Sequence, residues 1–335
     1  MSQMIDDLLH PTVYPEKTKN IHMVQTHIST VFIGDDYVYK IKKPVNFGFL
    51  DFSTLEKRRY YCQKEVELNN RFSQGIYLGV FPVTFDGTTY TIDGEGDVVD
   101  YAVKMRRLSD NDLLKTQFKN GMVTIDEMKR IGQAIARFHQ QAKRSKEIDT
   151  FGSLETLKFN TDENFEQTYE FIENTITKIQ YDELKTWTDN FYADNTNLIR
   201  QRIQGGKIRD CHGDLHMEHI CLTNPIIIFD CIEFNDRFRY SDVLSDISFL
   251  LMDLEFNGGT ELAHALRTAY LNDLPEKDTD DIARLMRYYK IYRAYVRGKV
   301  TSFVLNDGSV SDEKKIQATQ TAQRYFQLAH SYLPH

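Results

Sequence analysis

The sequence predicts an α+β protein of two lobes, a small antiparallel sheet with one helix followed by a larger, mainly helical lobe. The chain of 335 residues is about twice the length of a common single domain. Its first third contains short runs rich in β-branched and aromatic side chains, separated by Gly-containing turns, as strands are. Beyond residue 108 the apolar spacing becomes helical. We therefore place the domains at residues 1–108 and 109–335.

The first lobe contains a hairpin and one helix. Residues 31–33 and 37–42 flank the turn Gly34-Asp35-Asp36, which is a hairpin pattern. Ser53-Thr54-Leu55-Glu56 is a capping-box sequence that predicts a helix from Thr54 to about Phe72. Further strands are expected at residues 80–85, 88–92 and 100–105, which complete the sheet.

Glu65 lies on the inner face of this helix. It shares a stripe with Tyr61, Leu68 and Phe72 at spacings of three and four residues, so we expect it to face the protein. Glu67 neighbours charged residues instead and should be solvated.

The second lobe opens with another capping box, Thr124-Ile125-Asp126-Glu127. Helical patterns follow at residues 160–204, 282–300 and 312–333. They are interrupted by a short apolar hairpin within residues 208–235, and polar residues crowd both of its ends.

Composition limits the function. Hydrophobic residues make up 41% and charged residues 27%, with 7 Pro and 17 Gly, which excludes collagen-like, elastic and extensively disordered proteins. The net charge of −8 argues against nucleic-acid and anionic-membrane partners. Four Cys indicate reduced thiols rather than a disulfide framework. The opening segment has no signal-peptide pattern and no stretch is a membrane span, so we expect a cytoplasmic protein.

Four charged residues predict phosphoryl-transfer chemistry. Asp214 lies in the loop that enters the apolar hairpin, and Asp230 lies where the hairpin ends. Lys40 lies on an N-terminal strand, and Glu65 on the following helix is placed to pair with it. Phosphoryl transfer needs a carboxylate to orient the attacking hydroxyl, a carboxylate for Mg²⁺, and a lysine against the phosphates.

The motif Cys211-His212-Gly213-Asp214-Leu215-His216 resembles the catalytic loop of the aminoglycoside phosphotransferase-like kinases, within the protein-kinase-like superfamily. The likeness covers nearly the whole chain, and several motifs in the right order are more specific than one alone. It implies a two-lobed protein-kinase-like fold. The segments that further resemble an uncharacterised bacterial branch of that family are Thr26–Ser29, Val38–Val45, Phe49–Phe52, Ile232–Asp236 and Leu251–Glu255.

This resemblance assigns roles. Asp214 matches the catalytic base and Asp230 the metal-binding Asp. Lys40 matches the phosphate-binding lysine and Glu65 its helix partner. Lys42 is the alternative to Lys40, because both project from the same strand face.

The resemblance also implies an ATP site between the lobes. Met105 would precede the hinge, whose backbone at Arg106 and Leu108 would meet adenine. No glycine-rich loop joins the first two strands; Ser29 and Thr30 stand there instead.

One position departs from the family pattern. Five residues beyond the catalytic Asp the family normally has Asn, a second Mg²⁺ ligand, whereas this chain has His219. Mg²⁺ prefers oxygen ligands. The site therefore holds one Mg²⁺ through Asp230, prefers Mn²⁺, or is impaired.

The resulting hypothesis is an ATP-dependent kinase that phosphorylates a hydroxyl group of a small molecule. Two alternatives stay open. His219 favours a nucleotide-binding pseudokinase that acts as a sensor or scaffold. A hydrolase would use zinc held by some of His212, His216, His219, Cys211 and Cys221.

Other polar residues have two interpretations each. Asp242 and Asp246 either brace the catalytic loop or complement a helix dipole. His212 is expected to bond the backbone near Asp214. A last group either lines a pocket for an amine-bearing substrate or is surface acid: Glu233, Asp236, Asp253 and Glu255.

Overall fold

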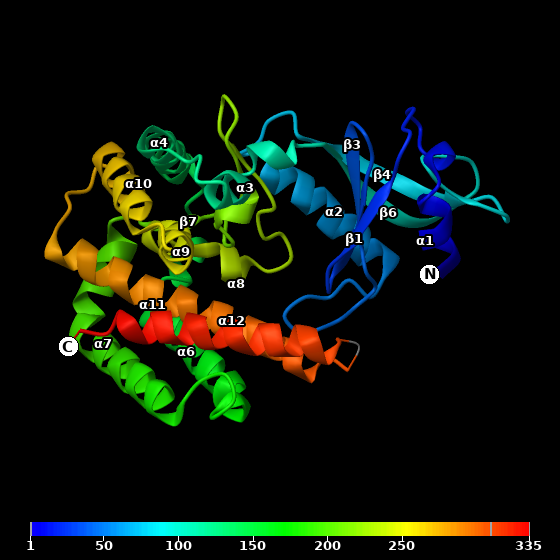
Figure 1. Ribbon diagram of the computed structural model, residues 1–335. Coiled ribbons are helices and arrows are strands. Elements are labelled where there is room, and N and C mark those ends of the chain that lie inside the picture. The colour runs from blue at the N-terminus through cyan, green and yellow to red at the C-terminus, as the bar shows by residue number, and fades with distance from the viewer. Residues whose placement is uncertain (1, 309, 335) are drawn as a thin grey trace. The chain divides into compact units, whose positions relative to one another are not determined.

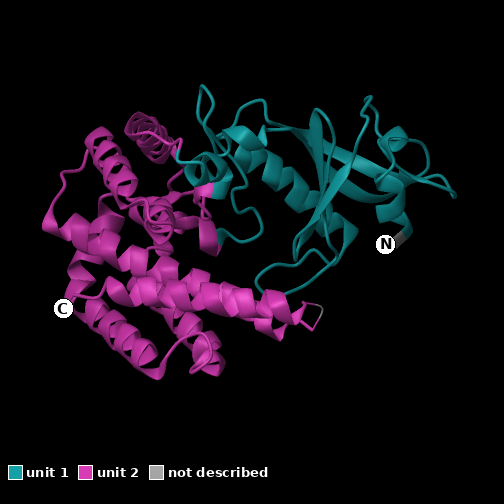
Figure 2. Cartoon of the chain, in the orientation of Figure 1, with its two compact units in different colours: residues 1–121, 218–236 teal, residues 122–217, 237–335 magenta. Residues whose placement is uncertain are grey.

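The structure is a computed structural model that describes residues 2–308 and 310–334. The chain forms two compact units (Figures 1 and 2). Unit 1 comprises residues 1–121 and 218–236, and unit 2 comprises residues 122–217 and 237–335. The stretch that contains Asp230 thus belongs to the same unit as the N-terminal sheet. The domain limits expected from sequence, 1–108 and 109–335, stay a prediction.

Within the described residues, unit 1 holds a six-stranded antiparallel sheet in the order β1-β2-β3-β6-β4-β5. The hairpin around residues 34–36 is confirmed as β2 and β3, and the central strand β6 pairs with both β3 and β4. The strands are β1 (His22–Gln25), β2 (Ser29–Ile33), β3 (Tyr37–Lys42), β4 (Tyr77–Phe85), β5 (Tyr90–Ile92) and β6 (Asp97–Arg106).

Alternation along the strands decides which side chains meet in the core. Phe32 of β2 and Tyr39 and Ile41 of β3 are buried together with Val83 and Ala102. Successive side chains of a strand point to opposite faces of the sheet. Because Tyr39 and Ile41 face the core, Lys40 and Lys42 lie on the opposite face.

Helix α2 (Leu55–Asn69) is the one long helix of unit 1 in the described part of the chain. Its cap is Thr54, whose side chain accepts from the amide of Lys57, one residue later than expected. The reason is that the hydroxyl of Ser53 bonds Asp51 at 2.6 Å. The helix buries Glu65 as expected, and it ends before Phe72.

The remaining elements of unit 1 include the predicted apolar hairpin. Its two short strands pair antiparallel and follow the single turn η4 (Met217–His219), which begins in unit 2. These elements are α1 (Ser2–Leu8), η1 (Pro11–Val13), η2 (Asp110–Asp112), α3 (Leu114–Lys119), β8 (Ile220–Cys221) and β9 (Ile227–Ile228).

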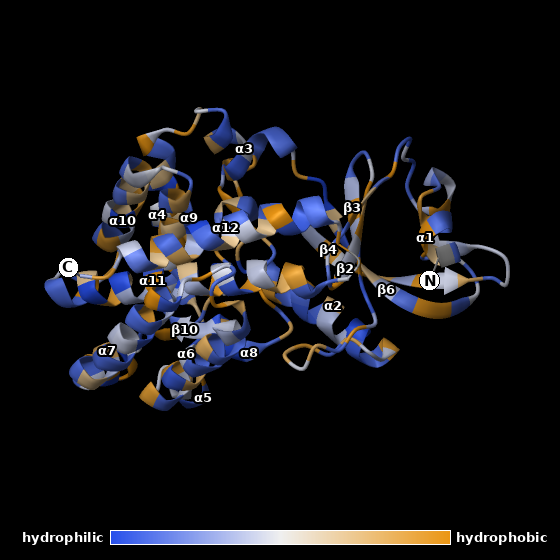
Figure 3. Ribbon diagram, turned by 60° about the horizontal axis from the view of Figure 1, so that its bottom comes forward, coloured by the Kyte–Doolittle hydropathy of each residue, from blue (hydrophilic) through white to orange (hydrophobic). Residues whose placement is uncertain are grey.

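Unit 2 is mainly helical. The capping box at Thr124 is confirmed, and a second one at Thr177 begins α7. In Figure 3, helices α7 and α10 carry hydrophilic and hydrophobic residues side by side, as helices that bury one face do. The elements are α4 (Ile125–Gln141), α5 (Lys146–Thr150), α6 (Leu154–Thr168), η3 (Tyr169–Phe171), α7 (Lys178–Gln204), β7 (Ile208–Asp210), α8 (Asp236–Arg239), β10 (Tyr240–Asp242), α9 (Val243–Phe256), α10 (Thr260–Asp273), α11 (Asp280–Ser302), η5 (Phe303–Asn306) and α12 (Asp312–Ser331).

Helix α9 lies at the centre of unit 2. Every residue from Val243 to Leu254 is buried, and α9 packs against both α10 and α11. A helix that is apolar on nearly all sides belongs in a core. Its burial gives Asp246, near its start, a fixed position from which to act on the neighbouring loop. Among the described helices, none combines the length and apolar character that crossing a membrane would require.

Candidate active site

Five charged side chains of unit 1 form one ion-pair network. Lys40 Nζ lies 2.9 Å from Glu65 Oε1 and 2.6 Å from Asp230 Oδ1. Lys42 Nζ lies 2.7 Å from Glu65 Oε2 and also contacts Glu233. The structure thus brings together the predicted residues Lys40, Glu65 and Asp230. It adds Glu233, which the sequence offered only as a pocket-lining or surface acid.

Burial in this network is uneven. The side chain of Glu65 is 0% exposed and that of Lys42 1%, whereas Lys40 is 14% and Asp230 39% exposed. Within the network, Asp230 and then Lys40 are therefore the groups that a ligand can reach.

Charge states follow from the mutual contacts. Burial alone would lower the pKa of Lys40 and of Lys42, but the adjoining carboxylates raise both above the ordinary value. Burial would raise the pKa of Glu65, but the two lysines hold it below its usual value. For Glu233 burial prevails and raises the pKa. Glu65 is therefore the carboxylate most strongly held as an anion between two ammonium groups.

Asp230 is presented by a turn directly after β9. Its φ of +60° lies in the left-handed region, which Asp tolerates better than most residues. Its amide donates to Tyr77 Oη at 3.0 Å, and the next amide, of Cys231, donates to Asn69 Oδ1 at 2.9 Å. His219 Nε2 lies 3.5 Å from Asp230 Oδ2. The imidazole thus stands beside the carboxylate, as its place in the sequence suggested.

The segment expected to meet the nucleotide contains an orphaned polar atom. Ser29 begins β2, is 1% exposed and pairs with Lys42 in the β2–β3 register. Among the described residues, its Oγ has no hydrogen-bond partner. A buried hydroxyl left unpaired is costly, so an acceptor such as a phosphate oxygen would satisfy it.

The predicted hinge follows β6. The amide of Arg106 donates to the Ile76 carbonyl at 2.9 Å, so this amide is engaged within unit 1. Leu108, two residues on, is half-buried.

The loop that carries Asp214 lies in unit 2 and is held through its backbone. Asp246 accepts from the amides of His212 at 3.0 Å and Gly213 at 2.9 Å. Arg293 donates to the Gly213 carbonyl at 2.9 Å. The Asp214 amide donates to His212 Nδ1 at 3.3 Å. The predictions that Asp246 braces this loop and that His212 bonds its backbone are confirmed.

Asp242 holds the start of α9 and pairs with Arg202. Its carboxylate accepts from the Leu244 amide at 2.9 Å, which caps α9. It also accepts two bonds from Arg202, at 2.7 and 2.8 Å. Of the two Asp residues, Asp242 therefore serves the helix start and Asp246 serves the loop.

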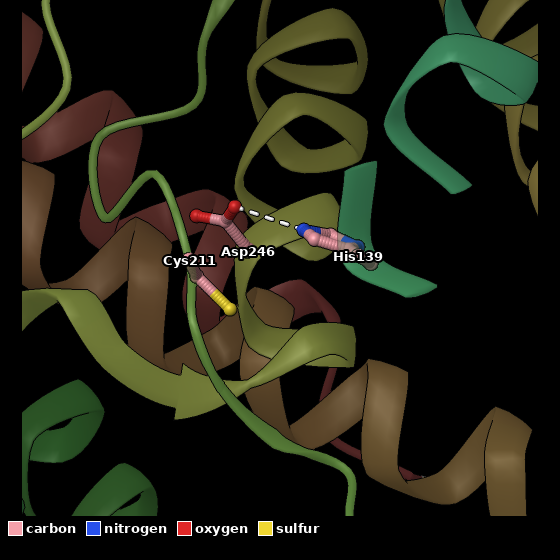
Figure 4. A group of neighbouring side chains, drawn as sticks. All are labelled: His139, Cys211 and Asp246. Carbon is pink, nitrogen blue, oxygen red and sulfur yellow. Dashed lines mark hydrogen bonds and ion pairs between the residues drawn. The ribbon is translucent and has the colours of Figure 1, made fainter. Parts of the chain in front are cut away.

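Figure 4 shows how Asp246 is itself positioned. His139 Nε2 lies 3.1 Å from Asp246 Oδ2, and His139 Nδ1 lies 2.8 Å from Tyr270 Oη. Burial would raise the pKa of Asp246, but the bond from His139 and the charge of nearby Arg293 lower it to about 2. Asp246 is thus an anion fixed between α4 and the loop.

Cys211 shares this cluster, and its ligand atom lies within 4.8 Å of those of His139 and Asp246. Burial raises the pKa of the thiol well above its usual value, and Sγ contacts the Ser241 carbonyl at 3.5 Å. The ring nitrogens of His139 and the oxygens of Asp246 already have hydrogen-bond partners. A hydrogen-bond network accounts for this cluster. Of its members, His139, Cys211 and Asp246, Cys211 alone belongs to the group of histidines and cysteines that suggested zinc in the sequence.

His216 is a site residue whose role the sequence did not reveal. Its Nε2 lies 3.4 Å from Asp214 Oδ2, and its side chain is 6% exposed. Burial alone would lower the pKa of His216, but the Asp214 carboxylate raises it above its ordinary value. The available signal was its place two residues after Asp214, within the motif itself.

The acids proposed for an amine-binding pocket are largely engaged within the chain. Glu233 contacts Lys42. Asp253 accepts from the Met217 amide at 3.0 Å. Glu255 pairs with Lys290 at 2.9 Å. Asp236 begins α8. The geometry therefore favours structural roles for the first three.

The profile of the Phosphotransferase enzyme family matches residues 105–281. That range is more than half of the chain, and it contains Asp214, Asp230 and Asp246. The chain belongs to this family. The expected family is thus confirmed, and the braced loop and the ion-pair network are features of a phosphotransferase-family protein.

The curated relatives of this phosphotransferase-family protein are uncharacterised. One from Mycobacterium tuberculosis is 32% identical over 317 residues, which cover 94% of this chain and 60% of the relative. A protein of Mycobacterium bovis matches equally. The chain spans about 60% of the length of these relatives.

Solved structures confirm the two-lobed kinase-like fold class. Choline kinase from Cryptosporidium parvum Iowa II is 9% identical with a TM-score of 0.56, covering 93% of this chain and 88% of that chain. Aminoglycoside 2′-phosphotransferase-IIIa, solved as a GDP complex, is 12% identical with a TM-score of 0.54, covering 98% and 99%. A choline/ethanolamine kinase family protein from Mesorhizobium loti is 13% identical with a TM-score of 0.52, covering 98% of each chain.

Proposed function

We propose that this phosphotransferase-family protein transfers the terminal phosphoryl group of ATP to a hydroxyl of a small molecule. The observation that carries the proposal is the convergence of Lys40, Glu65 and Asp230 on one another, in a chain whose Asp214 loop is braced by Asp246. Similar structures include a choline kinase and an aminoglycoside phosphotransferase bound to GDP. Their names support a nucleotide donor and a small-molecule acceptor.

Lys40 would hold the phosphates, with Glu65 keeping its ammonium in place. Asp230 would bind a divalent cation, which would neutralise phosphate charge. A carboxylate that is 39% exposed fits that role, because Mg²⁺ is usually bound through one or two carboxylates together with substrate phosphates. The imidazole of His219, 3.5 Å from Asp230, suits Mn²⁺ better than Mg²⁺. The unpaired Oγ of Ser29 would donate to a phosphate oxygen.

Asp214 would accept a hydrogen bond from the acceptor hydroxyl and receive its proton. The neighbouring His216, which pairs with it at 3.4 Å, would favour its anionic form. An anionic carboxylate orients the hydroxyl for in-line attack, and general-base assistance contributes roughly 10²- to 10⁴-fold to rate.

The test begins with thermal melts of the protein titrated with ATP in EDTA, Mg²⁺ and Mn²⁺. A metal-dependent rise in Tm is expected, because a ligand at about 100-fold over its Kd adds about 2.7 kcal/mol. Transfer of labelled phosphate from ATP to sugars, amino alcohols and aminoglycosides would then be measured. Asp214→Asn should lower turnover at least tenfold and leave ATP affinity nearly unchanged. Persistent turnover, or an equal loss of ATP affinity, would refute the role of Asp214.

His219 supports the second candidate, a nucleotide-binding pseudokinase that acts as a sensor or scaffold. Its imidazole lies 3.5 Å from Asp230, and the family resemblance implies that this position would carry a second metal ligand. His219→Asn discriminates between the two. Restored or increased metal-dependent turnover supports an attenuated kinase, whereas nucleotide binding without turnover in either protein supports the pseudokinase.

A further inference from the structure

Lys42 is sealed inside unit 1, although it lies only two residues from Lys40. Its side chain is 1% exposed. Its ammonium contacts Glu65 and Glu233, and it lies 4.8 Å from the centre of the Phe52 ring. A lysine enclosed in this way has its charge satisfied by the protein. It cannot reach a ligand without giving up both carboxylates.

Glu65 divides its carboxylate between the two lysines. One oxygen pairs with Lys40 and the other with Lys42. Loss of Lys40 would leave Glu65 still paired with a buried cation. Loss of Lys42 would leave Glu233 without the cation that it contacts.

Glu233 lies three residues beyond Asp230, so holding Glu233 restrains the segment that presents Asp230. The attachments of this segment to the rest of unit 1 include the amide of Asp230 to Tyr77, the amide of Cys231 to Asn69, the Asp230 carboxylate to Lys40, and Glu233 to Lys42. Lys42 supplies the ionic attachment of Glu233, whereas Lys40 supplies that of Asp230. Through Glu65, Lys42 also ties the same segment to α2.

We propose that the two lysines divide the work: Lys40 serves the nucleotide, and Lys42 is a positioning residue that locks α2 and the Asp230 segment to β3 through Glu65 and Glu233. The part assigned to Lys40 rests on the proposed function, whereas the anchoring part rests on unit 1 alone. The inference also decides between the two lysines that the sequence left as alternatives.

The anchoring part is tested by thermal unfolding of Lys42→Met, Glu233→Gln and the double variant. Removing one partner of a buried ion pair strands a charge, so Lys42→Met should lower Tm by about 5 °C or more. The control is Lys64→Met on α2, which removes a surface pair with Glu67 whose side chains are 35% and 65% exposed, and it should change Tm by about 1 °C or less.

The double variant is the decisive member of the series. It replaces the stranded carboxylate by a neutral amide, so its Tm should exceed that of Lys42→Met. The inference is overturned if the double variant loses as much Tm as the two single variants lose together. It is also overturned if Lys42→Met lowers Tm no more than the control does. If Lys42→Met is recovered only as aggregate, a folded double variant supports the inference, and aggregation of both overturns it.

Ligand binding separates positioning from mere stabilisation. The Kd of ADP would be measured about 15 °C below each Tm, in EDTA and in Mn²⁺. For Lys42→Met we expect the Kd in EDTA to stay within about twofold of wild type. The tightening caused by Mn²⁺ should fall at least fivefold, because the segment that presents Asp230 loses its attachment through Glu233. Lys40→Met should weaken binding in both conditions.

Two outcomes distinguish failure of this inference from failure of the proposed function. An intact Mn²⁺ effect in Lys42→Met, or weakening in EDTA equal to that of Lys40→Met, overturns the division of work. Absence of ADP binding by the wild-type protein in either condition refutes the proposed function instead, and the Tm series then decides the anchoring part alone.

Discussion

Asp246→Asn tests how strongly the catalytic loop depends on one buried carboxylate. The wild-type carboxylate accepts from the amides of His212 and Gly213 and pairs with His139. An asparagine has one acceptor oxygen, so its amide nitrogen would face one of these donors. A hydrogen bond to a charged group contributes about 1.5–3 kcal/mol. We therefore expect the variant to lose about 2–3 kcal/mol of unfolding free energy at pH 7.

The pKa of Asp246 gives an independent value for the same interaction. Its fall from the usual 3.8 to about 2 corresponds to about 2.4 kcal/mol. Because the folded-state pKa is the lower one, this stability is present above about pH 4 and is lost as the pH falls toward 2.

The assay is urea unfolding of the wild type and Asp246→Asn at pH 7 and pH 3. The difference between them should shrink by about 1 kcal/mol at pH 3, because the unfolded-state carboxylate is then largely protonated while the native one is still mostly ionised. Asp126→Asn, on an exposed face of α4, is the matched control and should behave as wild type. Equal stability of wild type and Asp246→Asn at pH 7, or a gap that does not vary with pH, would refute the reasoning.

Two further predictions concern buried cations of unit 2. Asp214 raises the pKa of His216 against the effect of burial, so the pair stabilises the fold below about pH 6.5 and loses that contribution as the pH rises through the higher folded-state pKa. In circular-dichroism melts, the Tm of His216→Gln should lack this loss. A Tm that falls with pH in the variant as it does in the wild type would count against the pair. Lys299, which donates to Asn164 and Gln167 at 2.7 Å each, has its pKa lowered by burial to about 8, which predicts that stability rises by about 3 kcal/mol between pH 8 and 10.5. Lys299→Met should abolish that rise, and a variant that keeps it would disprove the assignment.

The loop brace has a consequence for how substitutions at a distance should act. His139 lies on α4, outside the loop, and bonds the carboxylate that holds two successive loop amides. Its other nitrogen is tied to Tyr270 of α10. The position of the loop therefore depends on packing between α4, α9 and α10, because these helices fix both ends of the hydrogen-bond chain.

Local signals in the sequence were sufficient for much of the secondary structure. Runs of β-branched and aromatic residues on either side of a turn predicted β2 and β3, and the box at Thr124 predicted the start of α4, because these patterns involve neighbours within a few residues. The helical stripe also predicted the burial of Glu65. The N-cap of α2 is Thr54 and not the predicted Ser53, because the Ser53 hydroxyl bonds Asp51 instead. The capping-box motif does not include Asp51 and so could not predict this competition.

The sequence by itself determined the fold class, the family and the residue types needed for phosphoryl transfer. Only the tertiary structure decided how the charges pair. Lys40 and Lys42 share one strand face, so periodicity cannot tell them apart. What distinguishes Lys42 is its deeper burial and its contact with Glu233, 191 residues away. The link from His139 to Asp246 likewise joins residues 107 positions apart. Such pairings depend on which elements pack together, because the desolvation of a charge is a property of its surroundings in space and not of its neighbours along the chain.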